Sequence, residues 1–349
     1  MKKNLLIITQ KVDAQDDLLG FFVDWINEFS KKFDKVFVIT LWQGHYEAPA
    51  NVFVYSLGKE KNYSRFLKFI RFYFLLFKLI PKSSGIFAHM SPVFAVASWP
   101  VAFIFRKRII LWYLHRSVTS RLKLAENLVY KIATAAKESL NLKSKKIIEL
   151  GHGIKTERFK TERFWPAKNE KLRILSVGRI SKIKNYGTLI RAAKILKDRE
   201  LDFEIKIIGR PVMPDDFDYF KQLKNMTVDL GLKDIVEFAG FVPHSRISDY
   251  YKDSDIFINL APTGGIDKAV LEATASGLLV LISNLAFKKY FGGQDLFFKQ
   301  GNPDDLADKI SNLISLPSGK IKEISDFLVQ SVKRHHNLET LINSISSLF

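Results

Sequence analysis

Short apolar runs alternate with longer segments of helical spacing along most of the chain. The short runs are rich in β-branched residues and lack alternation, which is typical of strands buried on both faces of a parallel sheet. They predict strands at residues 5–9, 36–41, 52–57, 86–89, 109–114, 131–135, 146–150, 172–177, 203–209 and 236–240, from 256 up to the break at Pro262, and 278–282. The helical spacing predicts helices at 21–32, 63–80 and 92–105, one ending near 230, one after 265, and further helices to the end.

The alternation of strand and helix predicts an α/β protein with doubly wound parallel sheets. A chain of 349 residues is long for one core and suits two domains. The segment TERFWPAKNEK, which is charged and contains a proline, separates the two series of strands. We therefore expect a first domain at 1–165, a second at 166–320, and closing helices at 321–349.

Composition excludes several classes of site. The chain has no Cys, which rules out disulfides and thiolate metal sites, and its seven His show no zinc-like spacing. Met1 and two lysines precede only a short apolar run, which is a strand rather than a signal peptide. We expect a cytoplasmic protein without a metal site.

The net charge of +18 is concentrated in the first half of the chain. Residues 1–165 contain 28 Lys and Arg against 13 Asp and Glu, whereas the remainder contains 26 against 23. No acidic residue lies between Glu60 and Glu126, a stretch with twelve Lys and Arg. Such a field attracts phosphate-rich partners, either an anionic membrane surface or nucleic acid.

The segment 63–80, YSRFLKFIRFYFLLFKLI, predicts a helix with apolar residues on nearly every face and a stripe of Arg65, Lys68 and Arg71. This pattern fits a helix lying in a membrane interface, or a helix buried against the sheet with its charges in solvent. We favour the membrane interface because the charge is so uneven. The apolar segment 86–105 is interrupted by two prolines and divides into a strand and a helix rather than spanning a membrane.

Two glycine-bearing turns of the second domain follow strands and open into helices. In GRISKIKN, Gly178 frees the backbone, and Arg179 and Lys184 can both reach a diphosphate over the next helix start. The turn at Gly264 and Gly265 offers backbone N–H groups, and Glu272 follows on the next helix. Each turn alone is also compatible with solvated side chains and an ordinary loop.

The segment AVLEATASGLLVLISN resembles the donor-binding segment of family 4 glycosyltransferases, which are retaining enzymes of the GT-B architecture. Glu272, Ala273 and Gly277 match the second half of the family pattern. The first half departs from it, because the position of the family's earlier Glu is Gly264. Asp267 could take over the sugar contact of that Glu, or could be a helix cap or a solvated residue.

The resemblance implies two Rossmann-like domains facing across a cleft, with the terminal helix crossing back to the first domain. Arg179 and Lys184 would hold the donor diphosphate, Glu272 the ribose, and the backbone at Phe241 and Val242 the base. The wider donor site would include Gly20, Gly178, Gly209, Gly264, Gly265 and Ile266.

The same resemblance places a His at the end of a first-domain strand against the transferred sugar, and His115 follows the strand 109–114. Together with Arg179, Lys184 and Asp267 it completes the predicted catalytic set. A structural His115 and a plain turn glycine at Gly20 remain open alternatives.

The expected reaction is transfer of a sugar, with retention, from a nucleoside diphosphate-sugar to an acceptor hydroxyl, in cell-envelope glycan or glycolipid synthesis. The expected partners are the nucleotide-sugar donor and an anionic membrane surface or lipid-linked acceptor on the inner face of the membrane. No cofactor or metal is expected, since no Asp-x-Asp lies in a donor loop. The alternatives are a nucleotide-sugar epimerase of the same architecture and a non-catalytic phosphate or nucleic-acid binder. The latter does not explain the family register of Arg179, Lys184 and Glu272, so nucleic acid is the less favoured partner.

Overall fold

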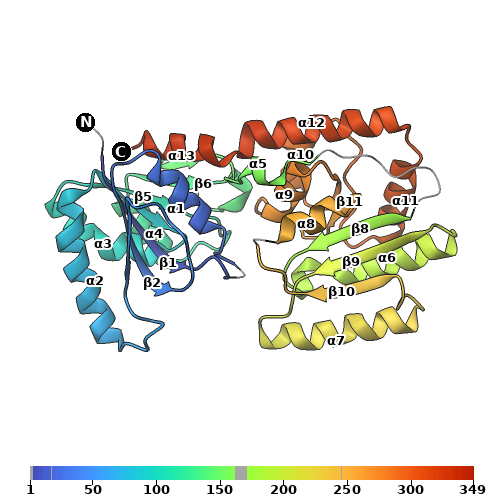
Figure 1. Cartoon of the computed structure of the whole chain (residues 1–349), viewed down its shortest axis with the longest axis horizontal. Helices are drawn as coiled ribbons and strands as arrows, with labels where there is room; N and C mark the ends of the chain where they lie inside the picture. Colours follow the sequence, from blue (N-terminus) through green and yellow to red (C-terminus); the bar gives the residue numbers. More distant parts are fainter. Residues whose placement is uncertain (1–2, 17, 162–170, 245) are drawn as a thin grey trace. The chain divides into compact units, whose positions relative to one another are not determined.

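The computed structural model describes residues 3–16, 18–161, 171–244 and 246–349. These form two compact units (Figure 1). Unit 1 comprises the chain up to Lys155 together with His336–Phe349, and unit 2 comprises Thr156–His335. The domain boundary predicted between residues 165 and 166 lies outside the described residues.

Unit 1 contains a seven-stranded parallel sheet with strand order β3-β2-β1-β4-β5-β6-β7. The inner strand β1 pairs on both sides, so that Leu5 lies opposite Val36 on β2 and Gly85 on β4. The strands are β1 (Leu5–Val12), β2 (Val36–Gln43), β3 (Val52–Ser56), β4 (Gly85–His89), β5 (Arg108–Trp112), β6 (Lys131–Thr134) and β7 (Ile147–Glu149).

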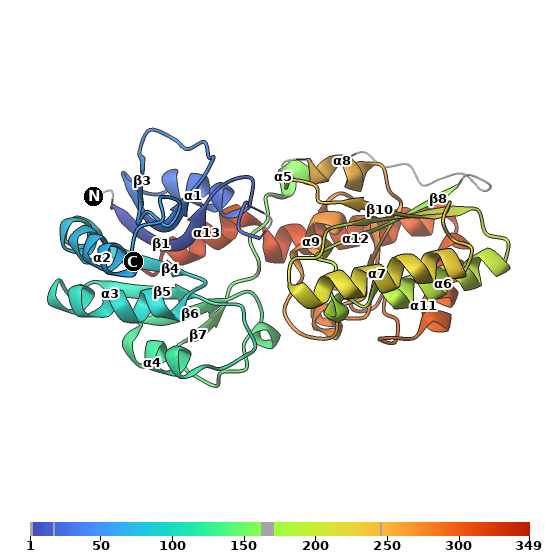
Figure 2. The same ribbon diagram turned by 90° about the horizontal axis from the view of Figure 1, so that it is seen from below.

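Helices cover both faces of this sheet (Figure 2). Alternate residues of β1 enter two separate cores: Leu5 and Ile7 pack with α1 and α13, whereas Leu6 and Ile8 pack with α2, α3 and α4. Burial on both faces explains why the strands are continuous apolar runs. The helices are α1 (Phe22–Ser30), α2 (Arg65–Leu79), α3 (Pro92–Ile104), α4 (Ser120–Leu128) and α13 (Leu338–Ser346), with short 3-10 turns at Ile80–Lys82 and Lys137–Ser139.

Unit 2 contains a five-stranded parallel sheet with order β10-β9-β8-β11-β12. Its strands are β8 (Leu172–Val177), β9 (Phe203–Ile208), β10 (Val236–Gly240), β11 (Ile256–Asn259) and β12 (Leu279–Ile282). Its helices are α5 (Thr156–Phe159), α6 (Tyr186–Asp198), α7 (Pro214–Asp229), α8 (Ile247–Lys252), α9 (Lys268–Ala275), α10 (Lys288–Phe291), α11 (Pro303–Ile314) and α12 (Ser318–His336), with 3-10 turns at Lys182–Lys184 and Leu285–Phe287.

The predicted α/β class with two doubly wound sheets is confirmed, and every predicted strand is present. The structure adds α4 and α8, for which the sequence pattern predicted no element. It also corrects the strand 109–114, because β5 ends at Trp112 and His115 therefore lies in the following loop. Among the described residues, no helix combines the length and apolar character needed to cross a bilayer.

Candidate active site

Three glycines end neighbouring strands of unit 2 and bring their backbones together. Gly178 follows β8, and its N–H donates to the carbonyl of Ile208 at 2.9 Å; the N–H of Gly209 donates to the carbonyl of Gly240 at 2.8 Å. A Cβ on Gly209 would lie 2.0 Å from the carbonyl oxygen of Gly178, at a φ of +143°. Only glycine fits there, so the carboxyl edge of the sheet stays open at the start of the next loops.

The loop after β8 presents Arg179 at this edge. Its Nε lies 3.6 Å from Oδ2 of Asp216, a buried carboxylate in the first turn of α7, and its side chain is 38% exposed. Asp216 also accepts from the backbone N–H of Met213 at 3.0 Å. One long ion pair with Asp216 therefore orients the guanidinium of Arg179, and its other N–H groups can donate to a ligand.

Lys184 and Asp267 form an ion pair that connects the loop after β8 with the start of α9. Asp267 also accepts from the side-chain amide of Asn259 at 3.0 Å, and it caps α9 by accepting from the N–H of Ala269 at 3.3 Å. Burial alone raises the pKa of Asp267, but the charge and hydrogen bond of Lys184 outweigh it and the pKa is lowered. The carboxylate of Asp267 is thus ionised at neutral pH.

Glu272 lies one turn beyond the start of α9 and is only 4% exposed. Its Oε1 is 2.8 Å from Nε2 of His244 and 3.3 Å from Nζ of Lys268, and its Oε2 accepts from the hydroxyl of Tyr251 at 3.2 Å. Burial raises the pKa of Glu272, but Lys268 and the hydrogen bond from His244 lower it to about 2. The alternative interpretation, a solvated Glu272, is therefore wrong, because the carboxylate is buried and ionised.

The hydrogen-bond roles of the His244 ring nitrogens follow from their neighbours. An ionised carboxylate only accepts hydrogen bonds, so the Nε2–H group of His244 donates a hydrogen bond to Glu272. The guanidinium of Arg158 lies 3.4 Å from Nδ1 and donates to the carbonyl of His244 at 2.7 Å. Because a guanidinium only donates, Nδ1 of His244 is the acceptor toward Arg158. The orientation of the ring then directs Nε2–H toward Glu272.

The turn between β11 and α9 is more closed than the sequence suggested. The side chain of Asn284 accepts from the N–H of Gly264 at 3.2 Å and donates to the carbonyl of Gly265 at 2.9 Å, while Ile266 is buried. The expectation of free backbone N–H groups is therefore wrong for Gly264, because this N–H already has a partner.

Phe241 and Val242 are half-buried in the segment that follows β10. The guanidinium of Arg210 lies 4.7 Å from the centre of the Phe241 ring. This segment starts beside the glycine cluster, at the same edge of the sheet as Arg179. A base contact there stays a prediction.

The two predicted site residues of unit 1 lie in its loops. Gly20 is buried in the turn before α1, and a Cβ would lie 2.7 Å from the carbonyl oxygen of Asp16, so the turn itself requires glycine. His115 is exposed three residues after β5, edge-on to the ring of Tyr113 at 5.4 Å. Their roles toward a ligand stay predictions.

Sequence reasoning missed the partners of Glu272. Lys268 had a usable signal, since it precedes Glu272 by one helical turn. His244 and Tyr251 had no such signal, because they precede Glu272 by 28 and 21 residues and only the fold brings them to α9.

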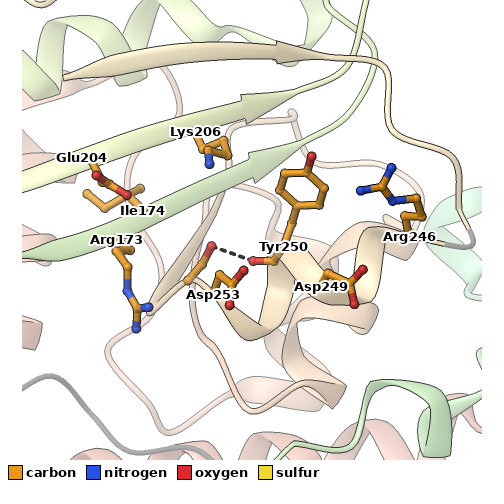
Figure 3. A pocket seen from close by; sticks show the side chains of 9 residues that line it. Arg173, Ile174, Glu204, Lys206, Arg246, Asp249, Tyr250 and Asp253 are labelled. Carbon is orange, nitrogen blue, oxygen red and sulfur yellow. Dashed lines mark hydrogen bonds between the residues drawn. The ribbon is translucent and has the colours of Figure 1, made fainter. Parts of the chain in front are cut away.

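A separate pocket lies between β8, β9 and α8 (Figure 3). Its lining mixes Arg173, Lys206 and Arg246 with Glu204, Asp249 and Asp253. Arg173 is already bound by Asp255, with Nη2 of Arg173 2.8 Å from Oδ1 of Asp255. None of the predicted site residues lines this pocket, and its balanced charges favour no ligand of either sign. Across the described parts of the chain, no group of three or more His, Asp or Glu is placed to hold a metal ion.

Comparison with solved structures defines the fold. The chain superposes over 99% of its length on Anabaena Alr3699/HepE in complex with UDP, with a TM-score of 0.76 and 14% identity, covering 99% of that chain. It superposes equally well on a glycosyltransferase from Rickettsia africae, with a TM-score of 0.76, 15% identity, and coverage of 99% and 97%. The two units therefore have the GT-B glycosyltransferase fold.

The sequence also matches a family over part of its length. Residues 157–326 match the family described as Glycosyl transferases group 1. The resemblance seen in the sequence is thereby confirmed.

Two curated relatives show how far the similarity extends. The amylovoran biosynthesis glycosyltransferase AmsK of Erwinia amylovora is 37% identical over 137 residues, which is 38% of this chain and 32% of that protein. The alpha-monoglucosyldiacylglycerol synthase of Streptococcus pneumoniae is 30% identical over 165 residues, or 45% and 35%. The matched part of the chain thus spans about a third of the length of each relative.

Proposed function

We propose that the chain is a retaining glycosyltransferase, which moves a sugar from a nucleoside diphosphate-sugar to an acceptor hydroxyl. One observation carries the proposal: Arg179, the Lys184–Asp267 pair and the ionised Glu272 lie along the carboxyl edge of one parallel sheet. This edge is where doubly wound sheets bind ligands. Two cations followed by a buried carboxylate suit the diphosphate and the ribose of a nucleotide.

The two cations would hold the donor diphosphate and stabilise it as it leaves. Arg179 is half-exposed, and its ion pair with Asp216 is long at 3.6 Å. Its guanidinium can therefore form a bidentate contact with phosphate. Lys184 is held by Asp267 and would contact the diphosphate as a point charge. Because both charges are preorganised, they would act on negative charge developing at the leaving group, and the proposal needs no metal ion.

Glu272 would accept hydrogen bonds from the ribose hydroxyls. Its carboxylate remains ionised because Lys268 and His244 stabilise the charge, so it can act only as an acceptor. In this proposal the backbone of Phe241 and Val242 contacts the base.

Asp267 would contact the transferred sugar in place of the glutamate that is absent at Gly264. Its position at the start of α9, bound to Lys184, supports this role because it lies beside the cation that holds the diphosphate. His115 and Gly20 of unit 1 would complete the site. With retention, the acceptor oxygen bonds to the anomeric carbon on the face that the diphosphate leaves, and the acceptor proton passes to the leaving phosphate oxygen.

The names of the similar proteins indicate which substrates to test. They include AmsK, which takes part in amylovoran biosynthesis, a human GDP-Man mannosyltransferase, and a synthase of a diacylglycerol glycolipid. The neighbouring HepE structures contain UDP or UDP-glucose. We propose a cell-envelope glycan or lipid acceptor and a UDP- or GDP-linked donor.

Release of nucleoside diphosphate from a panel of UDP- and GDP-sugars tests the proposal. With cell-envelope lipid or glycan acceptors we expect acceptor-dependent release, and NMR of the product should show the anomeric configuration of the donor. Conversion of the donor sugar without any acceptor would instead identify an epimerase. Inversion in the product would overturn the retaining assignment.

A further inference from the structure

The outer face of α2 is apolar even though its inner face already packs on the sheet. Phe72, Leu75, Leu76 and Leu79 are buried in the core of unit 1. On the opposite side, Phe66, Ile70, Phe74 and Phe77 follow one another at helical spacing and point to solvent, and Phe66 is 72% exposed. Leu67 and Phe69 extend this exposed surface. The helix therefore has two apolar faces, one buried against the sheet and one exposed, and the membrane-interface interpretation of segment 63–80 stays a prediction.

The neighbouring helix α3 continues this apolar surface. Its sequence PVFAVASWPVAFI contains no charged residue, and its single polar side chain, Ser98, is buried. Val93, Pro100, Phe103 and Ile104 are exposed, Phe103 at 68%. α2 and α3 lie side by side in both views (Figures 1 and 2), and the rings of Phe72 and Phe94 meet between them at 6.4 Å. We call the exposed residues of the two helices the α2–α3 face.

This surface is unusual within the same molecule. Of the twenty large apolar side chains that are exposed in the described residues, nine lie on α2 and α3. In monomeric soluble proteins, single exposed apolar residues are ordinary, whereas a contiguous patch of this kind marks an interaction site.

Cations surround the α2–α3 face. Arg65, Lys78 and Lys82 are exposed along α2 and just after it, and Arg106, Lys107 and Arg108 follow the end of α3. No acidic residue occurs in the sequence between Glu60 and Glu126. The partner that fits must therefore be apolar inside and negatively charged at its surface.

A pocket of about 550 Å³ lies at the end of α3, where the apolar face meets these cations. Its lining includes Trp99, Phe103 and Tyr130 together with the three cations, and no carboxylate among the described residues. The guanidinium of Arg108 lies 4.4 Å from the centre of the Tyr130 ring, which gives the pocket an aromatic wall. Aromatic rings beside cations suit a phosphate group attached to an apolar chain.

We propose that the α2–α3 face docks on a bilayer of anionic phospholipids, with a lipid phosphate in the pocket at the end of α3. α3 has 13 residues and is about 20 Å long, short of the roughly 30 Å of a hydrocarbon core, so it lies in the interface and does not cross it. A second copy of the chain fits the face less well, because it would bring the same cations together without compensating carboxylates.

Vesicle co-sedimentation tests the docking in the absence of any donor or acceptor. The chain should bind vesicles of phosphatidylcholine with phosphatidylglycerol, bind pure phosphatidylcholine far less, and lose binding as salt rises. The triple variant Phe74→Ser, Phe77→Ser, Phe103→Ser should lower the partition coefficient at least about tenfold. Arg106→Glu with Lys107→Glu should lower it about fivefold or more for each charge.

Matched variants on unit 2 control for unspecific effects. Phe217→Ser with Val228→Ser changes two apolar side chains of α7 with similar exposure, and Lys320→Glu with Lys322→Glu changes two exposed cations of α12. Both should bind vesicles like the unchanged chain. The variants alter exposed side chains, apart from the half-buried Lys107, so their thermal midpoints should agree. A variant with a lower midpoint is replaced by its single substitutions.

Three results would overturn the proposal. They are equal binding of the triple variant and its α7 control, tight binding of nucleic acid without vesicle binding, and a lipid-free dimer in sedimentation velocity that the triple variant abolishes. Docking is separate from catalysis, so Arg179→Ala should bind vesicles normally. Failure of sugar transfer with intact vesicle binding would therefore reject only the proposed function.

Discussion

Nε2 of His244 lies 2.8 Å from Oε1 of Glu272, although His244 lies in the loop after β10 and Glu272 lies in α9. This contact, together with Lys268, keeps a nearly inaccessible carboxylate ionised. A buried charge without such partners would shift its pKa upward and become neutral. The contact therefore keeps Glu272 in the ionised form, which accepts hydrogen bonds and cannot donate them.

Glu272→Gln should weaken binding of the nucleoside diphosphate by about 1.5–3 kcal/mol, because an amide replaces a charged acceptor. The size of the side chain is retained, so circular dichroism should be unchanged. Since the pKa of Glu272 is about 2, the carboxylate should not limit donor binding at any pH above about 4. Calorimetry that gives the same affinity for variant and parent would remove Glu272 from the donor site.

Asp267→Asn separates the proposed sugar contact from the helix cap. Asparagine can still cap α9, but it leaves Lys184 without its charged partner. We expect a nucleoside diphosphate to bind as well as before or more tightly, while turnover of the nucleotide-sugar falls at least about tenfold. Unchanged turnover would assign Asp267 to capping alone.

Gly209→Ala should destabilise unit 2 strongly. The new Cβ would lie 2.0 Å from the carbonyl oxygen of Gly178 at a positive φ, so the two strand ends must separate, at a cost of about 3 kcal/mol or more. Gly240→Ala is the matched control, because nothing lies within 4 Å of its Cβ and only the φ of +72° is strained. Urea unfolding should show about 1 kcal/mol for this control. Equal losses in both variants would contradict the close backbone approach.

Acid should destabilise unit 1 through His89. This side chain is fully buried, stacks on Phe22 at 3.7 Å, and shares a hydrogen bond of 3.1 Å with Thr9. Burial and the nearby His152 lower the pKa of His89 from 6.5 to about 3. The unfolded chain therefore binds a proton that the folded chain excludes between these two values.

The free energy of unfolding should consequently be unaffected by His89 above pH 6.5 and fall as the pH drops below it, by at most about 1.4 kcal/mol per pH unit. His89→Gln should reduce this slope by the contribution of one proton. Urea unfolding from about pH 7.5 to 5 measures it. Equal slopes in variant and parent would show that His89 titrates normally in the folded chain.

The strands were predictable because both faces of each sheet are buried, which leaves a continuous apolar run in the sequence. The position of Arg179 and Lys184 at one edge of the sheet was predictable as well, since both follow one strand and precede one helix. Residues that act across long sequence distances were not. His244 contacts Glu272 only because the end of β10 and the start of α9 lie at the same edge of the sheet.

Two local details also depended on distant residues. The N–H of Gly264 is engaged by Asn284, which follows the next strand of the chain. The exposed side of α2 could not be separated from its buried side in the sequence, because both are apolar. Only packing against the sheet shows which phenylalanines remain in solvent.

Arg179 and Lys184 are proposed to bind a nucleoside diphosphate, and titration calorimetry with UDP and GDP measures this binding directly. We expect one of these ligands to bind, and Arg179→Ala and Lys184→Ala each to lose about 2–3 kcal/mol of binding free energy. Lys182→Ala, an exposed lysine of the same loop, should bind like the parent. If neither ligand binds, or if both variants bind with the affinity of the parent, Arg179 and Lys184 do not form the donor site.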